Sequence, residues 1–348
     1  MKVLFGVFDW GLGHATRSTP LIEELCRKNE VHIVSTGRAL SLLKNHFKDK
    51  CKYYDVSSVY FSYPKSGFFA TKFTFSIPKM VSDLRRARRK TKEIINKNKY
   101  DVVVSDCRYD VYDKKENSFL INHQLSFKAP AFQFVTTNFL SKSMEKYCSV
   151  IVPDFPGRKL SGDLSFNQMF KGDVRYIGGL SRVEKNDCNE DVDFFISISG
   201  PEPQRSIFEK KVLEQIGFLS GNVVVAGGTP ELLNKKSFKD VKYFSYLSLE
   251  EQENVMNRSK FVISRPGYST VMELVELGKK NVLFVPTPGQ TEQEYLADFY
   301  EKKGLFHHVH QSKMNFKEDI DECGSFGGFV PEWKTKDSVK KFMKVICR

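Results

Sequence analysis

Short apolar runs alternate along the chain with amphipathic stretches of helical spacing. In the first half, the runs that predict buried strands are 2–8, 31–35, 100–106, 119–124, 131–132, 149–153 and 175–179. In the second half, they are 194–198, 223–226, 241–247, 260–263 and 281–285. Strands separated by helices favour parallel sheets, so the pattern predicts an α/β fold of two domains that face a cleft.

A polar segment, 181–191, predicts the boundary between a domain of residues 1–180 and one of residues 181–348. The charge balance changes at the same place. Residues 1–180 carry 30 lysines and arginines against 17 acidic residues, whereas residues 181–348 carry 24 against 25. A cationic first domain indicates an anionic partner, and nucleic acid, an anionic membrane and an acidic substrate all fit. Residues 338–347 predict a short amphipathic helix, which we expect to pack back on the first domain.

The composition, 41% hydrophobic and 28% charged, is typical of a soluble globular protein. The sequence contains no apolar run of about 18 residues, which a membrane-spanning helix requires. The chain begins with a strand-like run rather than a secretory signal. The seven cysteines are scattered, without a C-x-x-C pair. We therefore expect a cytoplasmic protein without a disulfide framework or a structural zinc site.

A glycine turn, Gly11 to Gly13, follows the first predicted strand, and His14 opens the next helix. Open α/β sheets bind ligands at the carboxyl ends of their strands, so His14 is a candidate general base. A helix cap or a surface position is the alternative for this histidine. The turn lacks the third glycine of the dinucleotide pattern, because Thr16 occupies that position, and this argues against a nicotinamide site.

Polar residues end two further predicted strands of the first half. One strand ends in Asp106, followed by Arg108 and Tyr109, and the next ends in His123 and Gln124. Parallel strands place these residues at the same sheet edge as the first glycine turn. Two histidines and an aspartate indicate a functional edge there, although their spacing favours no metal site.

The second half contains a strand, a Pro266-Gly267 turn and a helix over 269–277. This arrangement directs backbone N–H groups and the positive end of a helix dipole at one point, where a phosphate can bind. Glu273, one turn further on, is placed to accept hydrogen bonds from a ribose. An ordinary strand-to-helix turn with a surface glutamate is the alternative.

Two other turns of the second half have similar features. The additional candidates for phosphate contact are Ser199, Gly200 and Arg205, with a plain turn as the alternative. Residues 286–290 form a rigid loop, and Gln290 ends it. Thr291 and Glu294 have the spacing of a capping box, which predicts the start of a helix.

Residues 53–92 combine crowded aromatic residues with lysines and a predicted basic helix. A core-packing loop followed by a solvated basic helix explains this composition. An interfacial patch on an anionic membrane explains it equally, with rings in the headgroup region and bases on anionic lipid. Single-stranded nucleic acid would use the same residue types, but no nucleic-acid-binding motif accompanies them and we expect no such partner.

Four motifs, residues 11–17, 200–205, 265–273 and 286–293, make the sequence similar to the family 28 glycosyltransferases. These are relatives of the enzyme that adds N-acetylglucosamine to the lipid-linked precursor of peptidoglycan. The motifs occur in both halves of the chain. The resemblance implies the GT-B fold, in which two Rossmann-like domains hold a UDP-sugar in the C-terminal domain and the acceptor in the N-terminal one.

The resemblance also implies roles for individual residues. The ribose would bind Glu273, the uracil would lie near Leu247, and the diphosphate would lie against the start of the helix after Gly267. The predicted donor-binding residues are Gly13, Ser199, Gly200, Arg205, Leu247, Arg265, Gly267, Ser269, Thr270, Glu273, Gln290, Gln293 and Glu294. The predicted acceptor-binding residues are Arg17, Tyr109, His123 and Gln124, and the predicted catalytic residues are His14 and Asp106.

The sequence departs from the family pattern at three places. Glu294 stands where the family has a second glutamine, which leaves the donor sugar open. His123-Gln124 lacks the glutamate of the family's His-Glu-Gln run. Residues 105–109 replace a glycine-rich acceptor loop. We therefore expect an acceptor other than the peptidoglycan precursor.

The predicted activity is an inverting transfer of a hexose or N-acetylhexosamine from a UDP-sugar to a hydroxyl of a lipid or lipid-linked acceptor. Either His14 or Asp106 would be the base, without a tightly bound cofactor or metal. The basic stretch would attach the protein to the inner face of the membrane. The alternatives are a UDP-sugar epimerase of the same fold and a non-catalytic protein that binds a nucleotide sugar.

Overall fold

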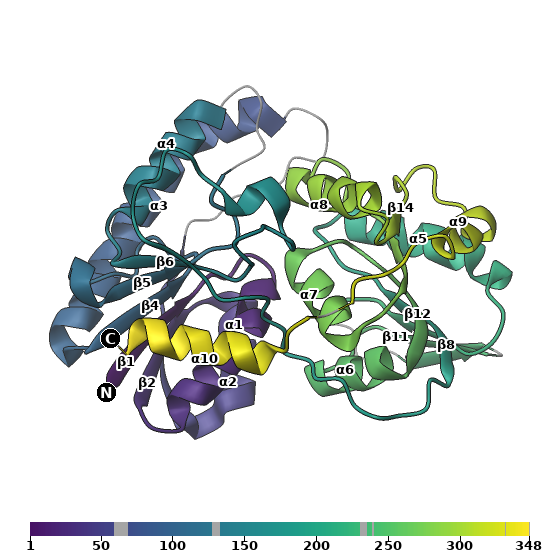
Figure 1. The fold of residues 1–348 in the computed structure, drawn as a ribbon, viewed down its shortest axis with the longest axis horizontal. Coiled ribbons are helices and arrows are strands. Elements are labelled where there is room, and N and C mark those ends of the chain that lie inside the picture. Colours follow the sequence, from purple (N-terminus) through teal and green to yellow (C-terminus); the bar gives the residue numbers. More distant parts are fainter. Residues whose placement is uncertain (59–68, 127–132, 230–234, 239, 331, 348) are drawn as a thin grey trace. The chain divides into compact units, whose positions relative to one another are not determined.

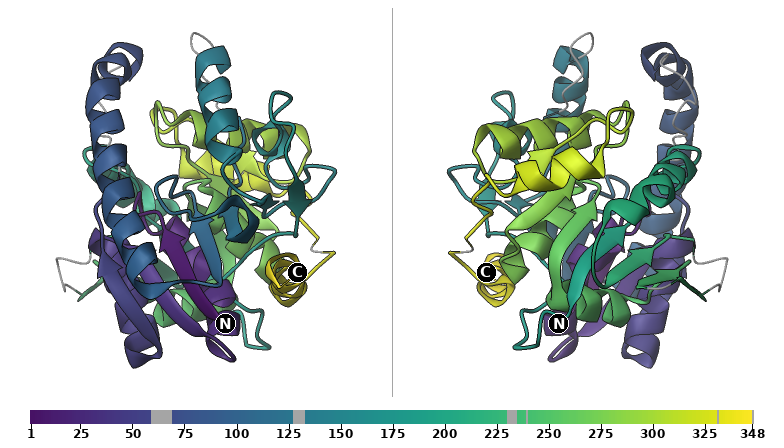
Figure 2. Two further views of the ribbon diagram at one scale, coloured as in Figure 1. Left: turned by 90° about the vertical axis from the view of Figure 1, so that its left-hand side faces the viewer. Right: turned by 90° about the vertical axis from the view of Figure 1, so that its right-hand side faces the viewer.

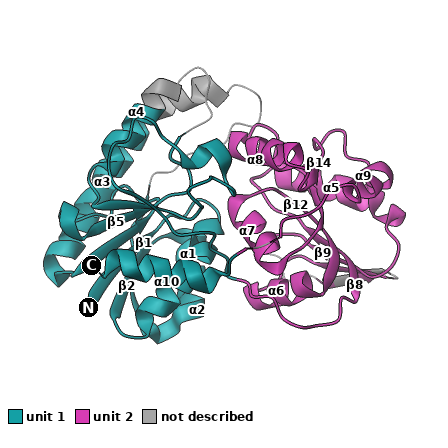
Figure 3. Ribbon diagram, in the orientation of Figure 1, with its two compact units in different colours: residues 1–182, 333–348 teal, residues 183–332 magenta. Residues whose placement is uncertain are grey.

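The computed structural model describes residues 1–58, 69–126, 133–229, 235–238, 240–330 and 332–347. The chain forms two compact units, residues 1–182 with 333–348 and residues 183–332 (Figure 3). Each unit is built around one seven-stranded sheet with helices packed on it, which is the predicted α/β architecture. The predicted strand at 131–132 lies outside the described residues.

The first unit contains a parallel sheet in the order β3-β2-β1-β4-β5-β6-β7 (Figure 1). Its strands are β1 (Lys2–Val7), β2 (Glu30–Ser35), β3 (Cys51–Asp55), β4 (Val102–Asp106), β5 (Ser118–Ile121), β6 (Ser149–Val152) and β7 (Val174–Tyr176). Its α-helices are α1 (Gly13–Cys26), α2 (Gly37–Phe47), α3 (Phe69–Asn98), α4 (Gln133–Met144) and α10 (Thr335–Ile346). Short 3-10 turns are Lys48–Lys50, Lys115–Asn117 and Gly162–Ser165.

The C-terminal helix α10 belongs to the core of the first unit. Val339, Phe342 and Ile346 lie on one face of this helix by their spacing, and they are buried with Val3 and Phe5 of β1. Figure 1 shows α10, in yellow, beside α1. The last residues of the chain therefore stabilise the sheet that its first residues begin.

The second unit contains a sheet in the order β10-β11-β9-β8-β12-β13-β14. Its strands are β8 (Val192–Ser197), β9 (Val223–Ala226), β10 (Lys235–Phe238), β11 (Val241–Phe244), β12 (Ser259–Ser264), β13 (Asn281–Phe284) and β14 (His307–His308). Its helices are α5 (Gln204–Gln215), α6 (Leu249–Arg258), α7 (Tyr268–Leu277), α8 (Thr291–Lys302) and α9 (Phe316–Cys323), with a 3-10 turn at Ile216–Phe218.

Three elements of the second unit differ from the prediction. β10 runs antiparallel to β11, although we expected parallel strands. β14 is two residues long and α9 eight, too short for a periodic apolar pattern to reveal. β10 and β14 are the two edge strands of the sheet, and the apolar runs predict the strands between them.

Within the described residues, no helix is long and apolar enough to cross a membrane. The longest, α3, is the long blue helix of the first unit in Figure 2 and has 30 residues. In residues 79–98, the part of α3 whose side chains are described, the exposed positions are mostly basic.

Candidate active site

The first group of predicted site residues lies where β4 ends and α1 begins. Asp106, the last residue of β4, pairs in register with Val7, the last residue of β1. Because the two strands are parallel, the loop after β1 brings the first turn of α1 to Asp106. Helical spacing places His14, Arg17 and Ser18 on one face of α1, and this face contacts the carboxylate.

Asp106 is fully buried and accepts four hydrogen bonds. Its Oδ1 accepts from Nδ1 of His14 at 2.9 Å and from Nη2 of Arg17. Its Oδ2 accepts from Nε of Arg17 at 2.9 Å and from Oγ of Ser18 at 2.8 Å. Burial by itself would raise the pKa of Asp106, but the adjacent Arg17 and His14 hold that pKa well below its usual range. The carboxylate is ionised and fully occupied, which suits it to orient His14 rather than to take a proton.

His14 is the part of this group that reaches solvent, with its side chain 15% exposed. A carboxylate can only accept hydrogen bonds, so the bonded Nδ1 of His14 carries a proton and the neutral ring keeps its lone pair on Nε2. The Phe8 ring packs edge-on against the imidazole, 5.3 Å between centroids, and also against Trp10. Gly13, directly before His14, is the first residue of α1. The imidazole is therefore held on one side by a buried acid and on another by a ring.

Arg17 joins this pair to a second histidine. Its Nη1 lies 2.5 Å from Nδ1 of His123, and its Nη2 lies 3.5 Å from Sγ of Cys107. The rings of His14 and His123 have centroids 6.3 Å apart. The structure thus brings four predicted residues, from α1, the end of β4 and the loop after β5, to one sheet edge.

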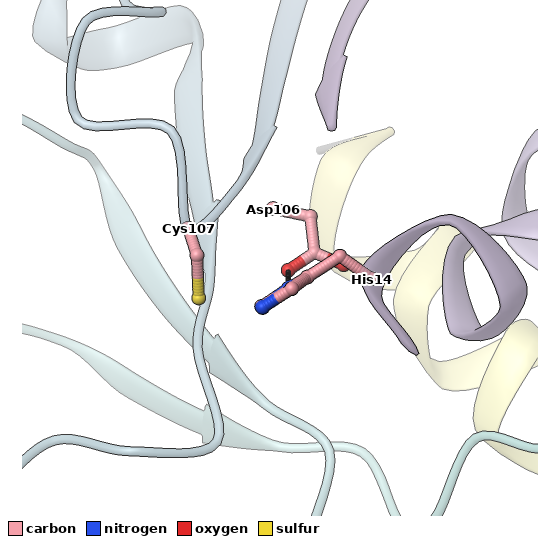
Figure 4. A group of neighbouring side chains, drawn as sticks. All are labelled: His14, Asp106 and Cys107. Atoms are coloured by element: carbon pink, nitrogen blue, oxygen red, sulfur yellow. Dashed lines mark hydrogen bonds and ion pairs between the residues drawn. The ribbon is translucent and has the colours of Figure 1, made fainter. Parts of the chain in front are cut away.

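A cation could in principle bind His14, Asp106 and Cys107, whose ligand atoms lie within 4.8 Å of one another (Figure 4). Arg17 donates two hydrogen bonds to Asp106 and contacts Cys107. Its guanidinium already supplies the positive charge that the carboxylate requires, and it would repel a metal ion at the same place. The geometry therefore favours an arginine-carboxylate-histidine site over a metal centre.

The remaining predicted residues of this edge bond to the protein itself. Asn122 donates from Nδ2 to the Tyr109 hydroxyl, and its Oδ1 accepts from the Gln124 amide, both at 2.9 Å. Burial raises the pKa of Tyr109 well above its ordinary value. Arg108, which we expected at this edge, is instead buried in a two-point ion pair with Asp110, at 2.7 and 3.0 Å. Its long side chain turns into the interior, where the Asp110 carboxylate accepts hydrogen bonds from the guanidinium and balances its charge.

The second group lies in the second unit around Arg265, which directly follows β12 and is 1% exposed. Its guanidinium donates to the carbonyls of Val285 and Pro286 at 2.8 and 2.9 Å. It also donates to the Gln204 carbonyl at 3.1 Å and to Oε1 of Gln311 at 2.5 Å. Burial lowers the pKa of Arg265 to about 9, so the group remains charged at neutral pH. In the described part of the chain, only neutral acceptors compensate this buried charge.

Three buried side-chain oxygens in the neighbouring loops have no hydrogen-bond partner among the described residues. They belong to Ser264 at the end of β12, Thr287 after β13 and Gln290 before α8. Gly200 lies close by, since a Cβ on it would stand 3.4 Å from Oγ1 of Thr287 and 3.9 Å from Nε of Arg265. Its φ of +119° suits glycine. Ser199, before it, accepts a 3.4 Å hydrogen bond from Arg265 through its carbonyl.

The start of α7 lies on the loop that Arg265 opens. Gly267 is the N-cap residue, and Ser269 and Thr270 lie in the first turn. The N-cap glycine has no side chain with which to cap the helix, and the first turn contains no acidic residue. Helix N-termini can bind anions through their backbone N–H groups and the helix dipole. Glu273 is buried further along the same helix.

The start of α8 corrects one prediction. Thr291 is the first helical residue rather than the N-cap, so the predicted capping box with Glu294 is wrong. Glu294 instead accepts from the Gly289 amide at 2.9 Å, and Gln293 accepts from the Thr287 amide at 2.9 Å. Both side chains therefore order the loop before the helix.

Arg205 and Leu247 are also in the second unit. Arg205 donates to Glu202 at 2.5 Å, to Glu209 at 3.1 Å and to the carbonyl of Gly227 at 2.9 Å. Two carboxylates already balance its charge, so Arg205 is less suited than Arg265 to attract an anion. Leu247 is buried directly before α6.

Part of the predicted interfacial stretch, 59–68, lies outside the described residues. The side chains of α3 are described from residue 79 onward, and seven exposed basic residues lie there: Lys79, Arg85, Arg86, Arg89, Lys90, Lys92 and Lys97. Arg88 differs from them, because its guanidinium lies 3.6 Å from the ring centre of Tyr112 and donates to the Tyr112 carbonyl at 2.5 Å. The exposed face of α3 is cationic, and Arg88 fastens the helix to the unit.

Sequence reasoning did not single out several residues of the two groups: Ser18, Cys107, Ser264, Thr287 and Gln311. The helical spacing from His14 would have indicated Ser18, and the strand ends would have indicated Ser264 and Thr287. Gln311 lies 46 residues from Arg265 and carries no local signal.

Comparison with known proteins identifies the class. Residues 1–115 match the model of Glycosyl transferase family 1, and residues 202–337 match that of the Glycosyltransferase family 28 C-terminal domain. Together with the fold, these matches place the chain among the glycosyltransferases of GT-B fold. A nucleotide sugar is the donor typical of that class. No curated protein matches the sequence significantly.

Solved structures share the fold over nearly the whole chain. The glycotransferase of kitacinnamycin has a TM-score of 0.65 at 11% identity, over 99% of this chain and 94% of that one. The spinosyn rhamnosyltransferase SpnG has 0.64 at 13%, over 100% and 96%. MurG of Acinetobacter baumannii has 0.56 at 13%, over 98% and 94%. At these identities the similarity establishes the fold alone.

Proposed function

We propose that the protein transfers a sugar, with inversion, from a UDP-sugar to a hydroxyl of a lipid or lipid-linked acceptor. The observation that carries this proposal is the pair formed by His14 and the buried, ionised Asp106, in a chain of GT-B fold. An imidazole held by a buried carboxylate is suited to general-base catalysis.

The reaction follows from the protonation of this pair. Nε2 of His14 takes the proton of the acceptor hydroxyl while the oxygen of that hydroxyl attacks the anomeric carbon of the donor sugar. The bond from that carbon to the diphosphate oxygen breaks at the same time, and the configuration inverts. Asp106 keeps the imidazole in position and stabilises its charge after the proton has moved. Its occupied oxygens and low pKa favour His14 over Asp106 as the base in this proposal.

The donor site of the proposal is the Arg265 group. The buried guanidinium, the hydroxyls of Ser264 and Thr287 and the amides of α7 from Gly267 onward would bind the diphosphate and stabilise its charge as it leaves. The second turn of that helix would bind the ribose through Glu273. Leu247 would contact the uracil. Gln290, Gln293 and Glu294 would contact the donor sugar.

The nucleotide of the proposal is UDP rather than TDP. A carboxylate at Glu273 would accept hydrogen bonds from both ribose hydroxyls, and a deoxyribose lacks one of them. One solved neighbour, SpnG, is complexed with thymidine diphosphate, so TDP is the relevant competitor. Titration calorimetry with both nucleotides tests this choice, and tighter binding of TDP would contradict it.

The acceptor of the proposal is a lipid or lipid-linked molecule on an anionic membrane surface, because the cationic face of α3 belongs to the unit that contains His14. The test of the whole reaction is release of UDP from a panel of UDP-sugars. We expect release that depends on added membrane extract and disappears in His14→Gln. Release that needs no acceptor, or that survives this substitution, would overturn the transferase assignment.

A further inference from the structure

Two histidines at the edge of the first sheet have different hydrogen-bond partners through the same ring atom. Nδ1 of His14 contacts a carboxylate oxygen of Asp106, and Nδ1 of His123 contacts a guanidinium nitrogen of Arg17. An ionised carboxylate only accepts hydrogen bonds, and a guanidinium only donates them. The two contacts therefore require opposite states of the two Nδ1 atoms.

We propose that Arg17 is a positioning residue that holds His14 and His123 in opposite tautomers, with the His14 proton on Nδ1 and the His123 proton on Nε2. The catalytic use of these tautomers rests on the proposed transferase function. The tautomers themselves are a property of the protein without ligand. Arg17 reaches both rings at once. It donates to both oxygens of Asp106, which orients His14, and its Nη1 lies 2.5 Å from His123.

The charge and burial of Arg17 make this arrangement specific. The guanidinium is 2% exposed and ion-paired with Asp106, so it cannot turn away from the site without leaving a buried charge unpaired. A proton on Nδ1 of His123 would oppose an N–H group of Arg17, because the two nitrogens are 2.5 Å apart and both would then be donors. In the proposed arrangement, Nδ1 of His123, which is itself 6% exposed, is therefore the acceptor and the ring carries its proton on Nε2.

The consequence is a division of roles between two neighbouring imidazoles. His14 has its lone pair on Nε2 and can take a proton there. His123 has a proton on Nε2 and can only donate a hydrogen bond from that atom. Two histidines with centroids 6.3 Å apart thus supply one base, not two interchangeable ones.

Long-range proton–nitrogen NMR of the full chain, labelled with ¹⁵N-histidine and free of ligand, tests the inference. The chain has seven histidines, and the spectra of His14→Gln and His123→Gln assign the two relevant ones. At neutral pH we expect the pattern of an Nε2–H tautomer for His123 and of an Nδ1–H ring for His14. An Nδ1–H or imidazolium pattern for His123 would overturn the proposal.

Substitution of Arg17 separates positioning from simple structural support. In Arg17→Met we expect the His123 signals to lose the single-tautomer pattern and to average between the two nitrogens. His32 is the internal control, because its partners Tyr100 and Glu30 do not involve Arg17. An unchanged His123 pattern in a folded Arg17→Met protein would contradict the proposal. If this variant does not fold, the wild-type spectrum still decides the tautomers.

The outcome is independent of the donor assignment. Calorimetry with UDP on the same labelled protein reports whether the nucleotide binds. Opposite tautomers without UDP binding would leave this inference standing and contradict the proposed donor. UDP binding together with an Nδ1–H tautomer of His123 would support the proposed donor and contradict this inference.

Discussion

The guanidinium carbon of Arg265 lies 4.2 Å from the centre of the Phe208 ring. Phe208 is fully buried on α5, so the ring shields one face of a charge whose edges donate to neutral oxygens. Such a site is costly when empty, because a buried charge prefers an ionic partner. The diphosphate of the proposed donor would supply that partner.

Replacement of Arg265 by methionine is expected to weaken UDP binding and to destabilise the second unit. The carbonyls of Val285 and Pro286 would lose their donor, at a cost of roughly 2–4 kcal/mol. Urea unfolding and UDP calorimetry measure the two effects. The control is Arg258→Met, which removes another arginine of this unit, one that pairs with Asp191 and belongs to no predicted donor contact. Equal loss of UDP binding in both variants would contradict the role of Arg265.

Replacement of Asp106 by asparagine is expected to reduce the transfer rate by about 10²- to 10⁴-fold, because His14 loses the acceptor that orients it. UDP binding should remain, since no proposed donor contact involves Asp106. Steady-state release of UDP from a UDP-sugar with membrane extract measures the rate. Asp110→Asn is the matched control, because Asp110 is equally buried and pairs with Arg108, away from His14. A similar rate loss in the control would show that folding, not orientation, is affected.

The stability of the second unit is expected to depend on the protonation of His307. Asp319 raises the pKa of His307 above its ordinary value, against the effect of burial and with help from Glu301 and Glu322. A raised folded pKa means that this stabilisation is fully present below the unfolded pKa of about 6.5. It is lost as pH rises through the folded pKa.

Urea midpoints between pH 5.5 and 8.5, compared for wild type and His307→Gln, test that dependence. The difference between the two proteins should be largest at the acid end of the range and shrink towards its basic end. His46→Gln, which removes an exposed imidazole of the first unit that pairs with Glu23, is the control for the loss of a histidine as such. A difference that grows with pH would refute the assignment.

The basic face of α3 is expected to bind anionic vesicles at low salt. Conversion of Arg85, Arg86 and Arg89 to glutamine should weaken binding by about 1 kcal/mol per residue near the surface. Arg88 stays in place, because it packs on Tyr112 and its loss would perturb the helix itself. Co-sedimentation with phosphatidylserine vesicles at increasing salt measures the effect.

The control for this experiment removes three exposed lysines of the second unit, Lys302, Lys313 and Lys317. It changes the net charge by the same amount without altering α3. Equal loss of binding in both triple variants would mean that total charge, rather than this face, attracts the membrane. Retained binding in the α3 variant would exclude the face altogether.

The sequence was sufficient for the elements that form the two sheets. Apolar runs predict β1, β4, β8, β12 and β13, because burial on both faces demands continuous hydrophobicity in a parallel strand. Since parallel strands end at one edge, the same pattern places His14, Asp106 and His123 together. The capping box at Thr291 failed because the helix begins there rather than one residue later, and local spacing cannot distinguish the two.

The sequence by itself determined which residues reach the sheet edges, since strand and helix periods are local properties. Only the tertiary structure decided which of those residues bond. Asp106 lies 92 residues from His14 and 89 from Arg17, and His123 lies 106 from Arg17. Contacts at such separations depend on strand register and on side-chain direction, which no local pattern encodes. The structure thereby assigned Arg108 to the interior and Arg17 to the site, although both are arginines beside the same strand end.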